Sequence, residues 1–102
     1  MDKLNFDWDE ANISHIAEHN VTPEEAEETL TGDPLEMDFD VSEDGEQRWS
    51  YLGETASGRL LYLVITLRNE KVRVITAFDP PAQDKRLYLE TKARLHDGFE
   101  DS

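Results

Sequence analysis

Hydrophobic residues near the start of the chain are first spaced two apart and then follow the spacing of a helix. Phe6 and Trp8 alternate with polar residues, which predicts a short N-terminal strand. Asp9 is a suitable N-cap for a helix that runs to about His19. Its apolar stripe, at intervals of three and four, consists of Ile13, Ile16 and Ala17. At about 100° per residue, His15 and His19 fall together on the polar side.

Capping residues predict a second helix. Thr22 is a good N-cap, Pro23 takes the first helical position, and Glu25 completes a capping box. The glutamates of the sequence PEEAEE lie near the helix N-terminus, where the helix dipole favours negative charge. Gly32 and Pro34 end the helix. Capping and solvation therefore explain the glutamate run without a catalytic use.

Beyond residue 34 the hydrophobic positions alternate with a period of two. The sequence LEMDFDV shows the alternation most clearly, and the apolar run in GRLLYLVITLR indicates a central strand. Short turn sequences, SEDG, ASG and NEK, separate four such segments. The predicted strands cover residues 35–41, 47–54, 59–68 and 72–78. Because turns this short join antiparallel neighbours, we expect a four-stranded antiparallel meander.

A last helix is predicted after Pro80 and Pro81, with Asp79 as its cap. Tyr88 lies beside the residues expected on its inner face, which are Leu87, Thr91 and Leu95. The predicted class is α+β: a short N-terminal strand, two helices, the meander and a C-terminal helix. We expect one domain over residues 1–96 and an acidic tail over 97–102.

Composition and charge narrow the function classes. The chain has no cysteine, so disulfides and thiolate metal sites are excluded. The acidic first ten residues do not resemble a secretory signal, and no apolar run is long enough to span a bilayer; we expect a cytoplasmic protein without membrane contact. The net charge of −14 is uneven, with −15 in residues 1–46 and +4 in residues 47–96. Only the later region suits a polyanion such as RNA.

Three stretches together resemble the BrnT-type toxins, a family formerly described as a domain of unknown function. They are FDWDEANISHIAEHNVTPEEAEETL, GRLLYLVITLR and VRVITAFDPPAQDKRLY, within residues 6–88. The resemblance implies a RelE-like ribonuclease fold and metal-independent RNA cleavage without a cofactor. It also implies a cognate antitoxin, of the ribbon-helix-helix type, that neutralises the toxin. A homo-oligomer is left open.

The resemblance also implies site residues. Arg68 and Arg73 match arginines on the family's last two strands, and His19 matches a family histidine, so these three are the catalytic candidates. Cationic side chains would hold the phosphate while a 2′-hydroxyl attacks it. The substrate-binding candidates are Arg59, Lys85 and Arg86. The last two are cations at a helix N-terminus, which the helix dipole disfavours, and this indicates an anionic partner: RNA or the acidic half of another chain.

Other uses of these side chains remain open. His15 and His19 have the i, i+4 spacing of a helical metal site, but no third ligand and no H-E-x-x-H sequence accompanies them. We therefore expect no metal, and both can be surface residues. The arginines can form surface ion pairs with the many carboxylates.

Departures from the family pattern support a second hypothesis. Glu18 and Glu54 stand where relatives often carry cations, and Phe78 stands where an arginine is common. The alternative function is therefore a catalytically weakened or inactive member of the same fold that acts as an acidic protein-binding module. A salt-adapted toxin would reconcile the acidity with activity.

Overall fold

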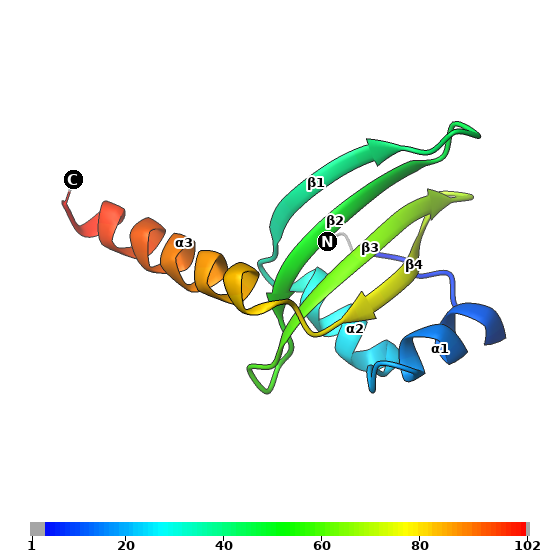
Figure 1. Cartoon of the computed structure of the whole chain (residues 1–102), viewed down its shortest axis with the longest axis horizontal. Coiled ribbons are helices and arrows are strands. Elements are labelled where there is room, and N and C mark those ends of the chain that lie inside the picture. Colours follow the sequence, from blue (N-terminus) through cyan, green and yellow to red (C-terminus); the bar gives the residue numbers. More distant parts are fainter. Residues whose placement is uncertain (1–3, 102) are drawn as a thin grey trace.

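The predicted α+β class is confirmed by the structure, a computed structural model that describes the chain from residue 4 to 101 and its side chains up to residue 95 (Figure 1). The described residues form three helices and one antiparallel sheet of four strands. In chain order the elements are α1 (Glu10–Ala17), α2 (Pro23–Thr31), β1 (Leu35–Val41), β2 (Gln47–Glu54), β3 (Leu60–Arg68), β4 (Lys71–Phe78) and α3 (Ala82–Asp101). α3 thus includes residues 97–101 of the predicted tail.

Local side-chain bonds fix where the first two helices begin. Asp9 caps α1 and Thr22 caps α2, and each forms a reciprocal capping box with the residue three positions on, Asn12 and Glu25. These bonds satisfy backbone N–H groups that have no partner inside the helix. Asn20, at φ 60°, takes the left-handed conformation after α1. The sequence rules for helix starts therefore apply to both helices.

The predicted N-terminal strand is not formed as a regular strand. Phe6 makes a single parallel bridge to Val72. Two backbone bonds hold it, from Asp7 N to Val72 O and from Val72 N to Asn5 O, both 2.8 Å. The pairing stops there because the chain turns at Asp9 into α1. The segment nevertheless ties the chain start to β4.

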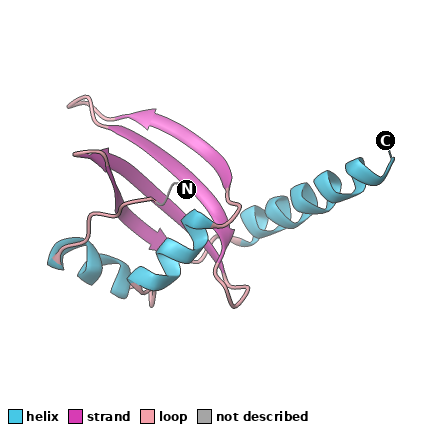
Figure 2. Cartoon of the chain, turned by 180° about the vertical axis from the view of Figure 1, so that it is seen from behind, coloured by secondary structure: helices cyan, strands magenta, loops and turns pink. Residues whose placement is uncertain are grey.

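The sheet is a meander with the order β1-β2-β3-β4, and α1 and α2 cover the same face of it (Figure 2). The core between them is formed by Ile16, Val21, Ala26, Leu30, Leu61, Leu63, Ile65, Val72, Val74 and Ala77. Gly53 lets α2 approach β2, because a Cβ there would lie 2.9 Å from the Thr29 Cγ2 atom. A two-residue turn, Asn69–Glu70, joins β3 to β4, and both residues have positive φ, 54° and 65°.

α3 starts at one end of the sheet and projects away from it (Figures 1 and 2). Tyr88 anchors the helix: it is 3 % exposed, and its hydroxyl donates to a Glu54 carboxylate oxygen at 3.0 Å. The predicted inner face is wrong for its leucines, because Leu87 and Leu95 are 46 % and 54 % exposed. The helix leaves the body of the protein too early to bury more of that face. No helix among the described residues is long and apolar enough to cross a membrane.

Candidate functional site

An open hollow of about 420 Å³ is lined by three arginines and one histidine from four elements. His15 comes from α1, Arg48 from β2, Arg68 from the end of β3 and Arg73 from β4. Glu46 lines the same hollow. We call this group of five residues the arginine hollow. Two of its guanidinium groups share the Glu46 carboxylate, and the third pairs with aspartates beside the hollow.

The hydrogen bonds of Asn12 position α1 beside the strands. This side chain is buried, and its amide donates to the backbone oxygens of Asp7 and Val74 at 3.0 and 3.2 Å. Asn12 thereby joins the helix start to β4. His15 follows three residues later on the neighbouring helical position, which directs it to the hollow.

Arg73 is the most strongly paired of the three arginines. Its guanidinium bonds both oxygens of Asp9, at 3.1 and 3.0 Å, and lies 3.6 Å from Asp7. The Arg73 hydrogen bond, followed by the Asn12 backbone N–H, lowers the pKa of Asp9 below its ordinary value. The Arg73 side chain is only 13 % exposed. It therefore anchors α1 to the sheet and contributes charge to one wall of the hollow.

Glu46 bridges the two more exposed arginines. Its carboxylate lies 3.1 Å from Arg48 and 3.3 Å from Arg68, each measured to a guanidinium nitrogen. The Arg48 and Arg68 side chains are 43 % and 51 % exposed. A guanidinium has five N–H donors, so both retain donors for an incoming anion. The two arginines are thus held near each other with their charges accessible.

His19 does not line the arginine hollow. Its ring lies 6.0 Å from that of His15, centroid to centroid, and 6.0 Å from the ring of Phe78. Phe78 in turn stacks on Tyr62 at 5.3 Å. The structure therefore brings Arg68 and Arg73 together with His15, and sets His19 one helical turn further along, against an aromatic pair.

Arg59 is engaged in holding the turn between α1 and α2. It donates to the backbone oxygen of Asn20 at 2.7 Å and pairs with Glu25 at 3.1 Å and Asp79 at 3.1 Å. Two carboxylates and a carbonyl leave it little free donor capacity. Its partners make Arg59 a clamp between the helices and the sheet.

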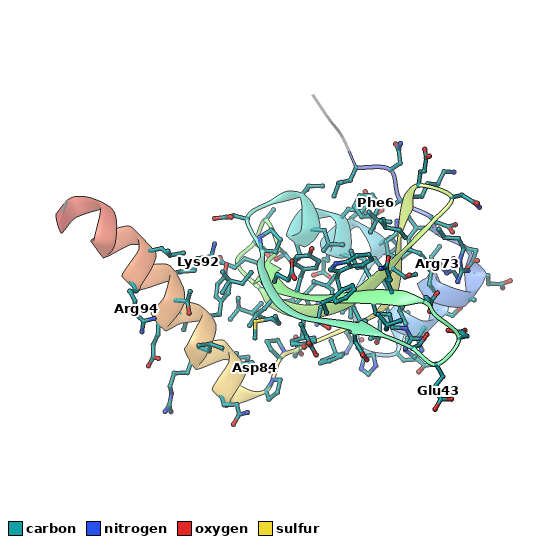
Figure 3. All side chains as sticks on the ribbon, turned by 90° about the horizontal axis from the view of Figure 1, so that it is seen from above. Phe6, Glu43, Arg73, Asp84, Lys92 and Arg94 are labelled. Atoms are coloured by element: carbon teal, nitrogen blue, oxygen red, sulfur yellow. The ribbon has the colours of Figure 1, made fainter. Side chains whose placement is uncertain are left out.

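Lys85 and Arg86 lie away from the arginine hollow, at the start of α3. Arg73 is near the opposite end of β4 from α3, and Phe78 lies five positions further along the strand, about 16 Å away. Figure 3 shows Arg73 beside α1 and the α3 cations Lys92 and Arg94 at the other side of the molecule. One phosphate cannot contact both groups.

Glu54 has a structural partner. Burial, and then the hydrogen bond to Glu54, raise the pKa of Tyr88 to about 12. The acid in the second strand thus holds α3 to the sheet. Among the described residues, no group of three or more histidine and acidic side chains is arranged to hold a metal ion.

Residues 8–80 match the family described as the ribonuclease toxin BrnT of type II toxin-antitoxin systems. The chain belongs to the BrnT family. The match spans both helices of the core layer and all four strands, so it includes every residue of the arginine hollow. No curated protein and no solved structure shows significant similarity to the chain. Membership of this family implies a ribonuclease toxin with an antitoxin partner.

Arg48 and Glu46 are members of this site that sequence reasoning missed. Arg48 lies two positions before Ser50 in β2, among the alternating residues that face away from the core. It therefore lies on the same face of the sheet as Arg73. The pairing of Trp49 with Ile65 and of Thr66 with Arg73 brings the three arginines to one end of the sheet. A strand alignment would have indicated Arg48. No local signal marks Glu46, which follows a turn.

Proposed function

We propose that this BrnT-family chain is a metal-independent endoribonuclease whose catalytic site is the arginine hollow. The observation that carries the proposal is the convergence of three arginines and His15 on one accessible surface in a family of ribonuclease toxins. Arginine forms bidentate bonds with phosphate oxygens and keeps its charge at any physiological pH. Such donors stabilise the extra negative charge that develops on phosphorus during cleavage.

The proposed reaction uses the RNA as its own nucleophile. The 2′-oxygen forms a bond to phosphorus while the bond from phosphorus to the 5′-oxygen breaks. Solvent accepts the 2′-hydroxyl proton, and His15 as imidazolium donates a proton to the departing 5′-oxygen. The products are a 2′,3′-cyclic phosphate and a 5′-hydroxyl, and no metal takes part. We assign the proton to His15 because it lines the hollow, whereas His19 packs on Phe78.

Arg48 and Arg68 are proposed to hold the scissile phosphate. Arg73, which stays paired with its two aspartates, adds positive charge at one wall of the hollow. The incoming phosphate replaces Glu46 as the anion between the two exposed arginines. Arg59 has a supporting role in this proposal. A cognate antitoxin of the ribbon-helix-helix type is proposed to neutralise the toxin.

The test is cleavage of a defined RNA by the purified chain in the presence of EDTA. We expect 2′,3′-cyclic phosphate ends, and no cleavage of the same RNA with 2′-O-methyl groups. Arg48→Ala with Arg68→Ala should lower the cleavage rate by about 100-fold or more. Lys71→Ala is the matched control, because Lys71 pairs with Arg68 across the hairpin but does not line the hollow. Cleavage that EDTA abolishes would contradict the proposal.

The second candidate function is an acidic protein-binding module on the same fold. It is favoured by the ion pairs themselves, since Asp7, Asp9 and Glu46 already neutralise much of the arginine charge. Under this alternative, induced expression causes no growth arrest and the purified chain cleaves no RNA at low or high salt. Under the first, expression arrests growth and the Arg48, Arg68 double variant relieves the arrest.

A further inference from the structure

A second hollow lies on the face of the sheet that α1 and α2 share. It consists of two adjacent depressions, about 710 and 270 Å³, which have Leu4 and Leu30 in common. Its apolar floor includes Trp49 and Leu67, and Leu67 is 56 % exposed. Along one side α2 contributes three acids, Glu24, Glu27 and Glu28. We call it the α2 groove: an exposed apolar surface edged by negative charge.

The apolar surface continues beyond the groove across the first strands. Phe39 and Val41 are 46 % and 50 % exposed, and Phe39 packs on Trp49 at 5.4 Å. The pairing of Phe39 with Trp49 and of Val41 with Gln47 places both on the helix-covered face of the sheet. α1 and α2 therefore cover only part of that face. Exposed apolar surface of this extent is typical of a site for another protein.

α3 has the complementary properties. Leu87, Thr91 and Leu95 form a stripe at helical spacing, and both leucines are about half exposed. Within residues 82–95 the helix carries four cations against two acids, Lys85, Arg86, Lys92 and Arg94 against Asp84 and Glu90. This segment therefore has a net charge of +2 and is amphipathic, in contrast with the net −15 of residues 1–46. Three further acids at positions 97, 100 and 101 bring the whole helix to −1, so the complementary charge is confined to residues 82–95.

The projection of α3 away from the sheet also indicates that another surface packs against this helix. Isolated helices of about 12–15 residues are marginal in water, and most helical stability in proteins comes from packing one face. Here one turn packs through Tyr88 and Lys92, while the rest of the described face meets solvent. A second packing surface would account for a helix of 20 residues.

We infer that α3 of one molecule docks in the α2 groove of a second copy of the chain. The leucine stripe would cover Leu67 and its apolar neighbours. Lys92 stays paired with Asp33 of its own chain, so the cations that would face the glutamates of α2 are Lys85, Arg86 and Arg94. Two molecules that exchange helices in this way form a closed twofold dimer. The contact leaves the arginine hollow of each copy accessible, so the inference does not depend on ribonuclease activity.

The first test is the mass of the full-length chain in solution. We expect sedimentation equilibrium to give twice the chain mass of 11.8 kDa at concentrations up to about 100 µM. Leu87→Glu with Leu95→Glu should raise the dissociation constant by more than about tenfold, which corresponds to about 1.4 kcal/mol. Leu89→Glu is the matched control: it is 60 % exposed on the same helix but off the stripe, and should change the constant by no more than about twofold.

A mixing experiment tests which surfaces meet. Leu67→Glu removes the groove and leaves α3 intact, whereas the Leu87, Leu95 double variant does the reverse. Each is expected to be monomeric alone, and an equimolar mixture is expected to form a heterodimer through the one intact helix and groove. Circular dichroism of every variant checks the fold, since all the altered side chains are exposed.

Three results would overturn the inference. One is a wild-type chain that stays monomeric throughout the concentration range. This result overturns the inference even if the groove binds an unrelated basic amphipathic peptide. Another is a dimer that the double variant leaves intact. The last is a mixture that stays monomeric although both single components are folded, because α3 and the groove would then not be each other's partners.

Discussion

Arg73 and Asp9 form a two-point ion pair across 64 positions of sequence, with N–O distances of 3.1 and 3.0 Å. Asp9 is also the N-cap of α1, and its Oδ1 atom accepts the backbone N–H of Asn12 at 3.1 Å. The same carboxylate therefore starts the helix that carries His15 and holds the arginine of the neighbouring strand. Helix start and arginine hollow are coupled through one side chain.

The pKa of Asp9 should reveal this coupling. Because the folded-state pKa lies below the ordinary value of 3.8, the pair stabilises the fold above pH 3.8 and is lost as the pH falls through the lowered pKa. NMR titration of the Asp9 carboxyl should show a lowered pKa in the wild type. In Arg73→Gln the pKa should rise towards 3.8, with part of the depression kept by the Asn12 bond. An unchanged value would contradict the pairing.

Asp9→Asn tests what the aspartate does to the hollow. Asparagine caps helices about as well as aspartate, so the start of α1 should persist, but Arg73 loses its main counter-charge. We expect tighter RNA binding, measured by fluorescence anisotropy with a labelled RNA at fixed salt, by about threefold or more. Asp40→Asn removes one negative charge from β1 outside the hollow and is the control. Equal effects of the two would indicate net charge alone.

His15 and His19 should differ in their contributions to cleavage. His15→Ala removes the proposed proton donor and should lower the maximal rate by about 100-fold while RNA binding changes little. His19→Ala removes a ring that contacts Phe78 and should leave the rate within about threefold. Single-turnover kinetics at saturating enzyme separate these effects from binding. The reverse order of effects would return the catalytic role to His19.

Gly53 should not tolerate a methyl group. In Gly53→Ala the new Cβ would lie 2.9 Å from Thr29 Cγ2 and 3.1 Å from Pro34 Cβ, which should lower the free energy of unfolding by about 1–3 kcal/mol. Thr29→Ser removes the nearer atom and keeps the hydroxyl that donates to the Glu25 backbone oxygen. Urea denaturation of the double variant should therefore recover part of the loss. No recovery would place the strain elsewhere.

Tyr88 should ionise at a pH well above that of an ordinary tyrosine. Its folded-state pKa of about 12 exceeds the ordinary value of 10, so its contribution to stability is complete below pH 10 and is lost as the pH rises towards 12. Absorbance titration at alkaline pH should show an ionisation step near pH 12, and Tyr88→Phe should remove it. In Glu54→Gln the step should shift to lower pH yet stay above 10, because burial is the larger cause.

Local signals account for the parts of the fold that the sequence predicted. Thr22 and Glu25 are three residues apart, so their capping box is visible without a structure. The alternation in LEMDFDV similarly reports a half-buried strand. The strand predicted at Phe6 is not confirmed beyond a single bridge, because a two-residue alternation cannot show that the chain turns at Asp9 into a helix. The prediction that Leu87 and Leu95 lie on the inner face of α3 was wrong for a related reason. Periodicity shows which residues share a helix face, but not whether another element covers that face.

The candidate site was only partly predictable. Arg68 and Arg73 could be named because the resemblance to the BrnT-type toxins implies arginines on these two strands, which one short turn joins. The choice between His15 and His19 depends on how far α1 extends along β4, which no sequence spacing encodes. The pairing of Arg59 with Glu25 and Asp79 joins residues 34 and 20 positions apart, and only the fold brings them together.

The two-residue turn at Asn69–Glu70 has a consequence for any redesign of this protein. Successive residues of a strand point to opposite faces, so the length of that loop determines which side of the sheet receives Arg73 once Arg68 is in place. One inserted residue that shifted the pairing would turn Arg73 inward and Val72 or Val74 outward, with every amino acid of the site still present. Whether the turn contains an even or an odd number of residues therefore determines whether Arg68 and Arg73 lie on the same face of the sheet. This number matters as much as the identity of the residues on either side of the turn.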